Sequence, residues 1–116
     1  MEKQKRMRLV VYLILGTCFW GTALSWATAQ EPYTIVIKNH QFNPPQLIIP
    51  VGQKIRITVD NQDASVEEFE SFDLNREKVV SGNKKIFVFI GPLTKGTYKY
   101  FGDFHQNTAQ GVIITQ

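Results

Sequence analysis

Cysteine is almost absent from this sequence. The single cysteine, Cys18, lies within an uncharged apolar run, and no other follows it in the 116 residues. A disulfide needs two cysteines and a thiolate metal site needs at least one, so the chain beyond Cys18 can form neither. A metal ion bound there would have to be held by imidazole and carboxylate groups.

A surplus of charge is also missing from most of the chain. The formal net charge of +3 comes from the first eight residues, where four basic residues face only Glu2. Residues 30–116 carry nine basic and nine acidic side chains. No basic stripe interleaved with aromatic residues remains in this part of the chain, so we expect no nucleic acid as a partner.

The N-terminal segment predicts export. Its basic start is followed by an uncharged run over residues 9–30, which includes the small residues Ala27-Thr28-Ala29 typical of a cleavage site. We therefore expect a signal peptide over residues 1–29 and a periplasmic domain over residues 30–116. The alternative is an uncleaved anchor in the inner membrane with the domain facing the periplasm, because the run can cross a hydrocarbon layer of about 30 Å. The membrane would then be contacted only through this segment.

Short β-strands dominate the rest of the pattern. Apolar residues alternate with polar ones, most clearly over residues 54–60, and this period of two turns one face of a strand inward. The continuous apolar run Ile86–Ile90 predicts a central strand covered on both faces. No apolar stretch has sustained helical periodicity, although residues 71–80 leave room for a turn of helix. Turn-forming residues separate the strands, so we expect an all-β fold, an antiparallel β-sandwich.

The inward positions of these strands predict the core. It comprises Ile35, Ile37, Leu47, Ile55, Ile57, Val59, Phe87, Phe89, Tyr98 and Ile113.

Two segments of this domain are informative together. The first is the run Phe42–Ile57 together with Asn61, and the second is the run Tyr98–His105 together with Gly111. Both segments resemble the cupredoxins, the small blue-copper fold. The resemblance implies a cupredoxin-like Greek-key β-sandwich over residues 30–116. In blue-copper members a histidine follows the asparagine, and a later loop carries a cysteine, a histidine and a methionine before the glycine.

The sequence departs from that pattern where the metal ligands are expected. Glu67 stands in place of the first histidine, Gly102 in place of the cysteine, and no methionine lies between His105 and Gly111. A type 1 blue-copper centre requires a thiolate and two imidazoles, so that centre is excluded. Imidazole and carboxylate ligands suit copper(II), zinc or iron, whereas copper(I) prefers sulfur.

Four residues are the predicted metal ligands. His105 occupies a ligand position of the family, and Asp103 beside it can add an oxygen. Glu67 replaces a ligand, and strand alternation turns it inward if Phe69 is inward. His40 ends a strand that in a cupredoxin runs toward the metal-bearing end.

Each of these residues also has a simpler interpretation. His105 could hydrogen-bond its own loop, and His40 could make hydrogen bonds at the surface. Glu67, Glu68 and Glu70 could form a solvated acidic edge. Alternation places Glu68 and Glu70 on the face opposite Phe69, which favours Glu67 as the ligand.

Further segments narrow the resemblance to one branch. The runs Glu67–Ser71, Asn75–Val79, Ile90–Leu93 and Phe101–His105 resemble the periplasmic cupredoxin-like domains of bacterial iron-uptake systems, including the front domain of the EfeO-type protein. The resemblance implies a protein that binds copper or iron and assists iron uptake by redox handling of Fe(II) and Fe(III). It also implies an iron permease, or another periplasmic or inner-membrane component of iron transport, as the partner.

Two other classes of function remain open. A metal-free periplasmic adaptor would dock an iron-transport partner through the acidic edge, but such an adaptor has no need for both histidines at the metal-bearing end. An enzyme would need a catalytic set, and the sequence has no nucleophile–histidine–acid arrangement, glycine-rich phosphate loop or paired-acid cleft. We predict no catalytic residues and therefore no hydrolase; if the protein has an enzymatic activity, we expect a ferroxidase-like redox activity.

The missing cysteine generates a spectroscopic prediction. Mature protein loaded with copper(II) should lack the intense thiolate-to-copper absorption of blue-copper proteins, because residues 30–116 contain no cysteine. Visible absorption of the cleaved protein measures this directly. An intense blue band would contradict the prediction.

Overall fold

Strands account for most of the described structure. The computed structural model describes residues 21 and 32–116. The signal peptide expected over residues 1–29 therefore lies outside the described residues, apart from Gly21. In the part that is described, no helix is long and apolar enough to cross a membrane.

Nine strands and one short 3-10 helix follow one another in residues 32–116. The elements are β1 (Thr34–Lys38), β2 (Gln41–Asn43), β3 (Gln46–Ile49), β4 (Ile55–Asn61), β5 (Glu67–Ser71), β6 (Arg76–Val80), β7 (Lys85–Ile90), β8 (Gly96–Phe101), η1 (Asp103–His105) and β9 (Gln110–Thr115). The alternation of apolar and polar residues alone predicts fewer strands than these nine. Residues 71–80, where it leaves room for a turn of helix, instead contain β6.

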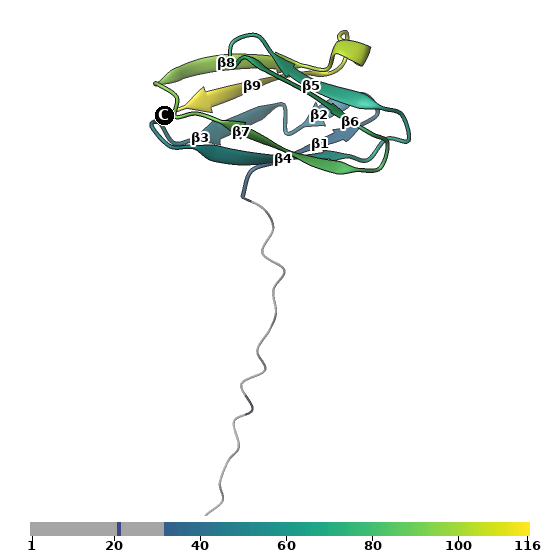
Figure 1. Cartoon of the computed structure of the whole chain (residues 1–116), viewed down its shortest axis with the longest axis horizontal. Helices are drawn as coiled ribbons and strands as arrows, with labels where there is room; N and C mark the ends of the chain where they lie inside the picture. Colours follow the sequence, from purple (N-terminus) through teal and green to yellow (C-terminus); the bar gives the residue numbers. More distant parts are fainter. Residues whose placement is uncertain (1–20, 22–31) are drawn as a thin grey trace, which may run out of the picture.

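The strands form two sheets that pack face to face (Figure 1). One sheet has the order β2-β1-β4-β7 and the other has the order β3-β9-β8-β5-β6. Both sheets are mixed, which corrects the expected antiparallel arrangement: β1 pairs in parallel with β4, and β3 with β9. The chain changes sheet repeatedly, so neighbours within a sheet need not be joined by hairpins.

The core lies between the two sheets. Inward side chains of β1 and β4, such as Ile37 and Val59, are fully buried, as is Ile113 of β9. The predicted core positions Ile35, Ile37, Leu47, Ile55, Ile57, Val59 and Ile113 are all buried. Tyr98 is partly buried and packs against the core. The period of two therefore predicts most of the core, because one face of each strand meets the opposite sheet.

Strand β7 contradicts the sequence prediction. It is an edge strand, not a central one, and the side chains of Phe87 and Phe89 are each 45% exposed. Val88 and Ile90 face the core instead. The Arg56 guanidinium lies 4.6 Å from the centre of the Phe87 ring, and Lys54 Nζ lies 5.3 Å from that of Phe89. These cation–π contacts cover part of the outward aromatic surface, which stabilises the two phenylalanines in their exposed positions.

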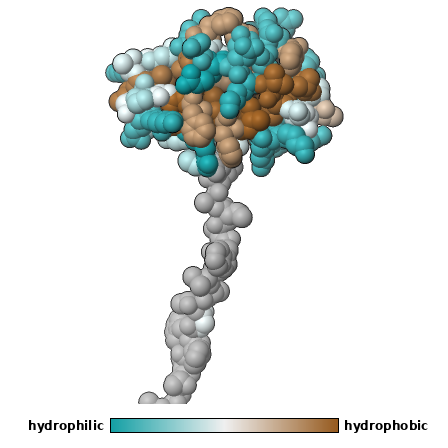
Figure 2. All heavy atoms as spheres, viewed as in Figure 1, coloured by the Kyte–Doolittle hydropathy of each residue, from teal (hydrophilic) through white to brown (hydrophobic). Residues whose placement is uncertain are grey.

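Side chains of β6 cover the open edge of β7. Arg76 Nε donates to the Phe89 carbonyl at 2.8 Å, and Lys78 Nζ donates to the Phe87 carbonyl at 3.0 Å. Unpaired carbonyls on an edge strand can recruit another chain, and charged side chains are a common protection. Apolar residues nevertheless remain visible between hydrophilic ones on the surface of the sandwich (Figure 2).

The orientation of β7 can be tested by paired substitutions. Ile90→Ala should lower the free energy of unfolding by about 2–5 kcal/mol, because it leaves a cavity in the core. Phe87→Ala removes a larger side chain but should cost only about 1 kcal/mol, chiefly the contact with Arg56. Urea unfolding of both variants measures the difference, and a larger loss for Phe87→Ala would contradict this orientation.

Candidate metal centre

His40 is presented by the tight turn between β1 and β2. Lys38 pairs with Gln41, so Asn39 and His40 form the corner, with φ angles of 52° and 58°. A two-residue turn of this kind requires left-handed backbone at both positions, and glycine is preferred at the second. His40 occupies that second position, so its imidazole is presented at the end of the hairpin. The left-handed backbone that this requires is energetically unfavourable for a histidine.

Glu67 lies at the start of β5 and is almost completely buried. It is 1% exposed and shares the inward face of β5 with Phe69, so the expected inward direction is confirmed. Glu67 Oε1 accepts from Ser65 Oγ at 3.1 Å and lies 2.6 Å from His40 Nδ1. Glu67 Oε2 lies 3.0 Å from His105 Nδ1. A carboxylate can only accept hydrogen bonds, so both imidazoles donate from Nδ1.

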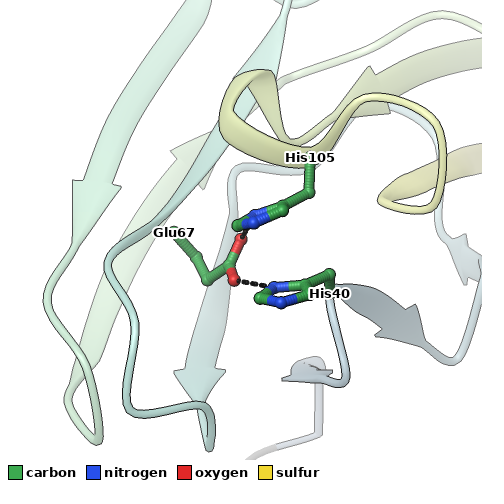
Figure 3. A group of neighbouring side chains, drawn as sticks. All are labelled: His40, Glu67 and His105. Atoms are coloured by element: carbon green, nitrogen blue, oxygen red, sulfur yellow. Dashed lines mark hydrogen bonds and ion pairs between the residues drawn. The ribbon is translucent and has the colours of Figure 1, made fainter.

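His105 completes the group from the short helix η1, which follows β8. Its backbone carbonyl accepts from Thr108 N at 3.1 Å and Ala109 N at 2.8 Å, which holds the loop in a compact turn. The imidazoles of His40 and His105 are stacked, with ring centres 3.5 Å apart and an interplanar angle of 17°. Figure 3 shows the two rings one above the other, with the carboxylate of Glu67 reaching both.

The arrangement of these three side chains fits a metal ion. One ligand atom from each of His40, Glu67 and His105 lies within 4.8 Å of the others. An ion bound at about 2.1 Å from each ligand in tetrahedral geometry separates the ligands by about 3.4 Å. The carboxylate–imidazole distances of 2.6 and 3.0 Å would need to open by less than about 1 Å to reach that value, and each imidazole would carry its proton on Nε2 so that Nδ1 is free to bind the ion.

Solvent can reach the site from one side. The side chains of His40 and His105 are 41% and 32% exposed, while that of Glu67 is 1% exposed. The two histidines line an open hollow of about 600 Å³ with the loop over residues 103–108. An ion could therefore enter past the imidazoles and meet the buried carboxylate behind them.

Asp103, the fourth predicted ligand, lies with a different group. Its carboxylate is within 4.8 Å of those of Glu68 and Glu70, and it is not in the group of His40, Glu67 and His105. Glu68 points away from Phe69 as expected, yet it is 3% exposed because η1 packs against β5. The alternative of a solvated acidic edge therefore fails for Glu68, as it does for Glu67.

The acidic group shifts the pKa of its buried member. Burial raises the pKa of Glu68 to about 7, assisted by its hydrogen bond with Glu77 and by the negative charges of Glu70, Glu77 and Asp103. The pKa of Glu70 is also raised, first by desolvation and then by Glu77 and Asp103. Glu68 consequently tends to keep its proton where an ordinary glutamate has lost it.

Gly102 stands where the cupredoxin resemblance places the copper-binding cysteine. A Cβ atom at this position would lie 2.9 Å from Ala109 Cβ and 3.1 Å from the Glu68 carbonyl. Phe42 closes the same space, with its Cζ 3.6 Å from that atom. A side chain at Gly102 would thus require its surroundings to move, so the position cannot simply take a cysteine.

An aromatic cluster lies beside Gly102 and supports this end of the sandwich. Tyr100 stacks on Phe69 with ring centres 4.9 Å apart and meets Phe42 edge-on at 5.0 Å. Tyr100 is 1% exposed, and burial raises its pKa. Tyr100 is thus a packing residue of the core.

Sequence reasoning overlooked two residues of the loop between β4 and β5. Ser65 donates to Glu67, and Asp63 accepts from the backbone of Asn39 and His40. Burial opposes ionisation of Asp63, but those two hydrogen bonds and the charge of His40 outweigh it, so the pKa of Asp63 lies below its usual value. The segment has the composition of a turn, and only the fold places it beside the histidines.

The comparisons with known proteins point to one family. The sequence model of the cupredoxin-like domain family matches residues 10–115. The uncharacterized protein RP394 of Rickettsia prowazekii (strain Madrid E) is 50% identical over 80 residues, which cover 69% of this chain and 64% of that protein. The match thus spans less than two thirds of that relative's length.

Solved cupredoxin structures have the same fold. A purple cupredoxin from Nitrosopumilus maritimus matches 72% of this chain and 99% of its own, with a TM-score of 0.58 and 22% identity. Auracyanin A, a "blue" copper protein from Chloroflexus aurantiacus, matches 72% and 96%, with a TM-score of 0.63 and 17% identity. Amicyanin from Paracoccus versutus matches 72% and 80%, with a TM-score of 0.57 and 14% identity. At these identities the likeness shows the fold alone.

The raised pKa of Glu68 predicts a pH dependence of stability. The folded protein holds this proton up to a pH of about 7, whereas an ordinary glutamate loses it near 4.5. Unfolding therefore releases a proton between these values, and the free energy of unfolding should fall as pH rises through them. With allowance for solvent screening, we expect a fall of about 1–2 kcal/mol.

Urea unfolding across that pH range measures the effect. Glu68→Gln should flatten the dependence, because the amide does not titrate. Asp60→Asn serves as the control, since Asp60 is paired with Lys85 outside the acidic group. An identical slope in wild type and Glu68→Gln would assign the dependence to other groups.

Proposed function

The chain belongs to the cupredoxin-like family, and on that premise we propose that it is an exported metal-binding protein holding a copper or iron ion between His40, Glu67 and His105. The observation that carries the proposal is the shared carboxylate. A carboxylate that is 1% exposed holds two partly exposed imidazoles beside it by hydrogen bonds, which brings together three groups able to coordinate a metal. The cupredoxin-like fold is itself consistent with metal binding.

The chemistry of the ligands narrows the choice of ion. Two imidazoles and a carboxylate are borderline and hard ligands, which suit copper(II), zinc and iron and disfavour copper(I). When bound, copper or iron supplies one-electron redox chemistry. His40, Glu67 and His105 would hold the ion, and the open hollow beside the two histidines would give water or an exchanging ligand access to it. We propose a centre that is not of type 1.

We further propose that this protein serves bacterial iron uptake from the periplasm. The support is the resemblance of its runs Glu67–Ser71 and Phe101–His105 to the cupredoxin-like domains of iron-uptake systems. Iron would then be the cargo, handled as Fe(II) or Fe(III), and an iron permease or another inner-membrane component would be the partner. An inner-membrane anchor formed by the N-terminal segment would place the domain on the same side of the membrane.

Metal titration of matched variants tests the metal site. Protein exported from the full sequence should bind copper(II). A substitution outside the ligand shell typically weakens metal binding by about 10–100-fold. Because they remove ligands, His105→Ala, Glu67→Gln and His40→Gly should each weaken it by more than that. Affinity should also fall in acid, because imidazoles must be neutral to coordinate. Calorimetry with copper(II), and with iron under controlled oxidation, gives the dissociation constants.

Two features of this experiment separate metal binding from folding. His40→Gly should fold normally, since glycine suits the left-handed turn and offsets the lost hydrogen bond to Glu67. Asp60→Ala removes an acidic side chain from β4 without touching the site and should bind copper(II) like wild type. Equal affinity in wild type and His105→Ala, with the fold intact by circular dichroism, would reject the site and favour the metal-free adaptor.

A further inference from the structure

The turn that carries His40 is held by one side chain from another loop. Asp63 Oδ1 accepts from Asn39 N at 2.8 Å, and Asp63 Oδ2 accepts from His40 N at 3.0 Å. The two donors are the backbone amides of the two residues with left-handed backbone. Each carboxylate oxygen therefore accepts a hydrogen bond from one backbone amide of the turn. An asparagine side chain has the same shape but offers only one acceptor oxygen, because its other terminal group is a donor.

This contact stabilises a conformation that the turn sequence does not favour by itself. Left-handed backbone at two successive residues other than glycine is unfavourable, and here the second is a histidine. Without a partner for both amides, other conformations of the turn become competitive. The His40 imidazole would then leave the position from which it reaches Glu67.

Asp63 is itself fixed by the surrounding backbone. Its amide donates to Asn61 Oδ1 at 3.0 Å, and its carbonyl accepts from Asn83 N at 2.9 Å. Asn61 is fully buried, and its side-chain nitrogen donates to the carbonyls of Ser65 and Val80 at 2.8 and 3.3 Å. The carboxylate of Asp63 is thus presented from a rigid part of the sandwich.

The same loop also holds the second ligand. Ser65 lies two residues beyond Asp63 in this loop, and its Oγ donates to Glu67 Oε1 at 3.1 Å. His40 belongs to a turn of the four-stranded sheet, whereas Glu67 belongs to the five-stranded sheet. The loop between β4 and β5 therefore sets the relation between ligands that come from different sheets.

We propose that Asp63 is a positioning residue of the metal site, which fixes His40 by holding its backbone in the left-handed turn. This inference rests on the proposed function, because it takes His40 as a metal ligand. Asp63 acts on His40, through the amides of Asn39 and His40 and through its Oδ2, which lies 3.6 Å from His40 Nδ1. Its loss should therefore displace the His40 ring even when no metal is bound.

The first arm of the test measures copper(II) affinity. Asp63→Ala should weaken binding by about 10–100-fold, the range typical of residues that orient a ligand. Asp63→Asn keeps one good acceptor for the two amides and should show an intermediate loss, which keeps the test informative if Asp63→Ala folds poorly. Asp60→Ala removes the same charge from the preceding strand and should leave the affinity unchanged.

A second substitution distinguishes positioning from charge. Adding Asn39→Gly to Asp63→Ala introduces a residue that adopts the left-handed turn without help. The double variant should regain most of the lost affinity if Asp63 acts by holding the turn. Failure of this rescue, or wild-type affinity in Asp63→Ala, would overturn the proposal.

An arm without metal separates this inference from the proposed function. The stacked imidazoles, 3.5 Å apart, should give ring-current-shifted proton signals in NMR spectra of the metal-free protein. These shifts should diminish in Asp63→Ala and return in the double variant. If the wild type binds no copper(II) or iron, the proposed function fails, while these spectra still decide whether Asp63 positions His40. Unchanged shifts in Asp63→Ala would overturn the inference in either case.

Discussion

The structure of the site depends on the buried carboxylate of Glu67. Placing an ionised group in a protein interior is unfavourable unless hydrogen bonds or opposite charges compensate for lost hydration. Here Ser65, His40 and His105 supply the hydrogen bonds, from the β4–β5 loop, the β1–β2 turn and η1. Because these segments belong to different parts of the fold, the sandwich must close correctly for the charge to be tolerated. A metal ion at the same place would meet both the charge and the imidazoles.

Strand β5 separates two groups with different chemistry. Glu67 faces inward toward the histidines, while the next residue, Glu68, faces outward toward Asp103 and Glu70. Residues of η1 divide in the same way, since His105 joins the first group and Asp103 the second. In the first group, imidazoles satisfy the carboxylate. In the second, burial and then the neighbouring carboxyl groups raise the pKa of Glu68, so this acidic group tends to hold a proton.

Much of the fold was predictable, and the failures share a cause. Alternation located buried positions such as Ile57 because each strand has one inward face. It failed at Phe87 and Phe89, since an unbroken apolar run does not reveal which face is inward or whether the strand lies at an edge. The family resemblance supplied His105 and Glu67, and the structure brings both together with His40. It did not supply Asp63, which resembles any turn residue until the loop is folded against the β1–β2 hairpin.

The sequence by itself determined that this is an all-β chain whose residues after Cys18 cannot form a thiolate centre, because these properties follow from alternation and composition. It also determined the kinds of ligand available, two histidines among several acids. The sequence favoured both Glu67 and Asp103 beside the histidines, and the tertiary structure decided that Glu67 joins them while Asp103 lies with Glu68 and Glu70. The pleat of β5 sends Glu67 and Glu68 to opposite faces, and His105 and Asp103 of η1 divide in the same way. The left-handed turn at His40 and the crowding at Gly102 were likewise decided by packing, since both depend on atoms far away in the chain.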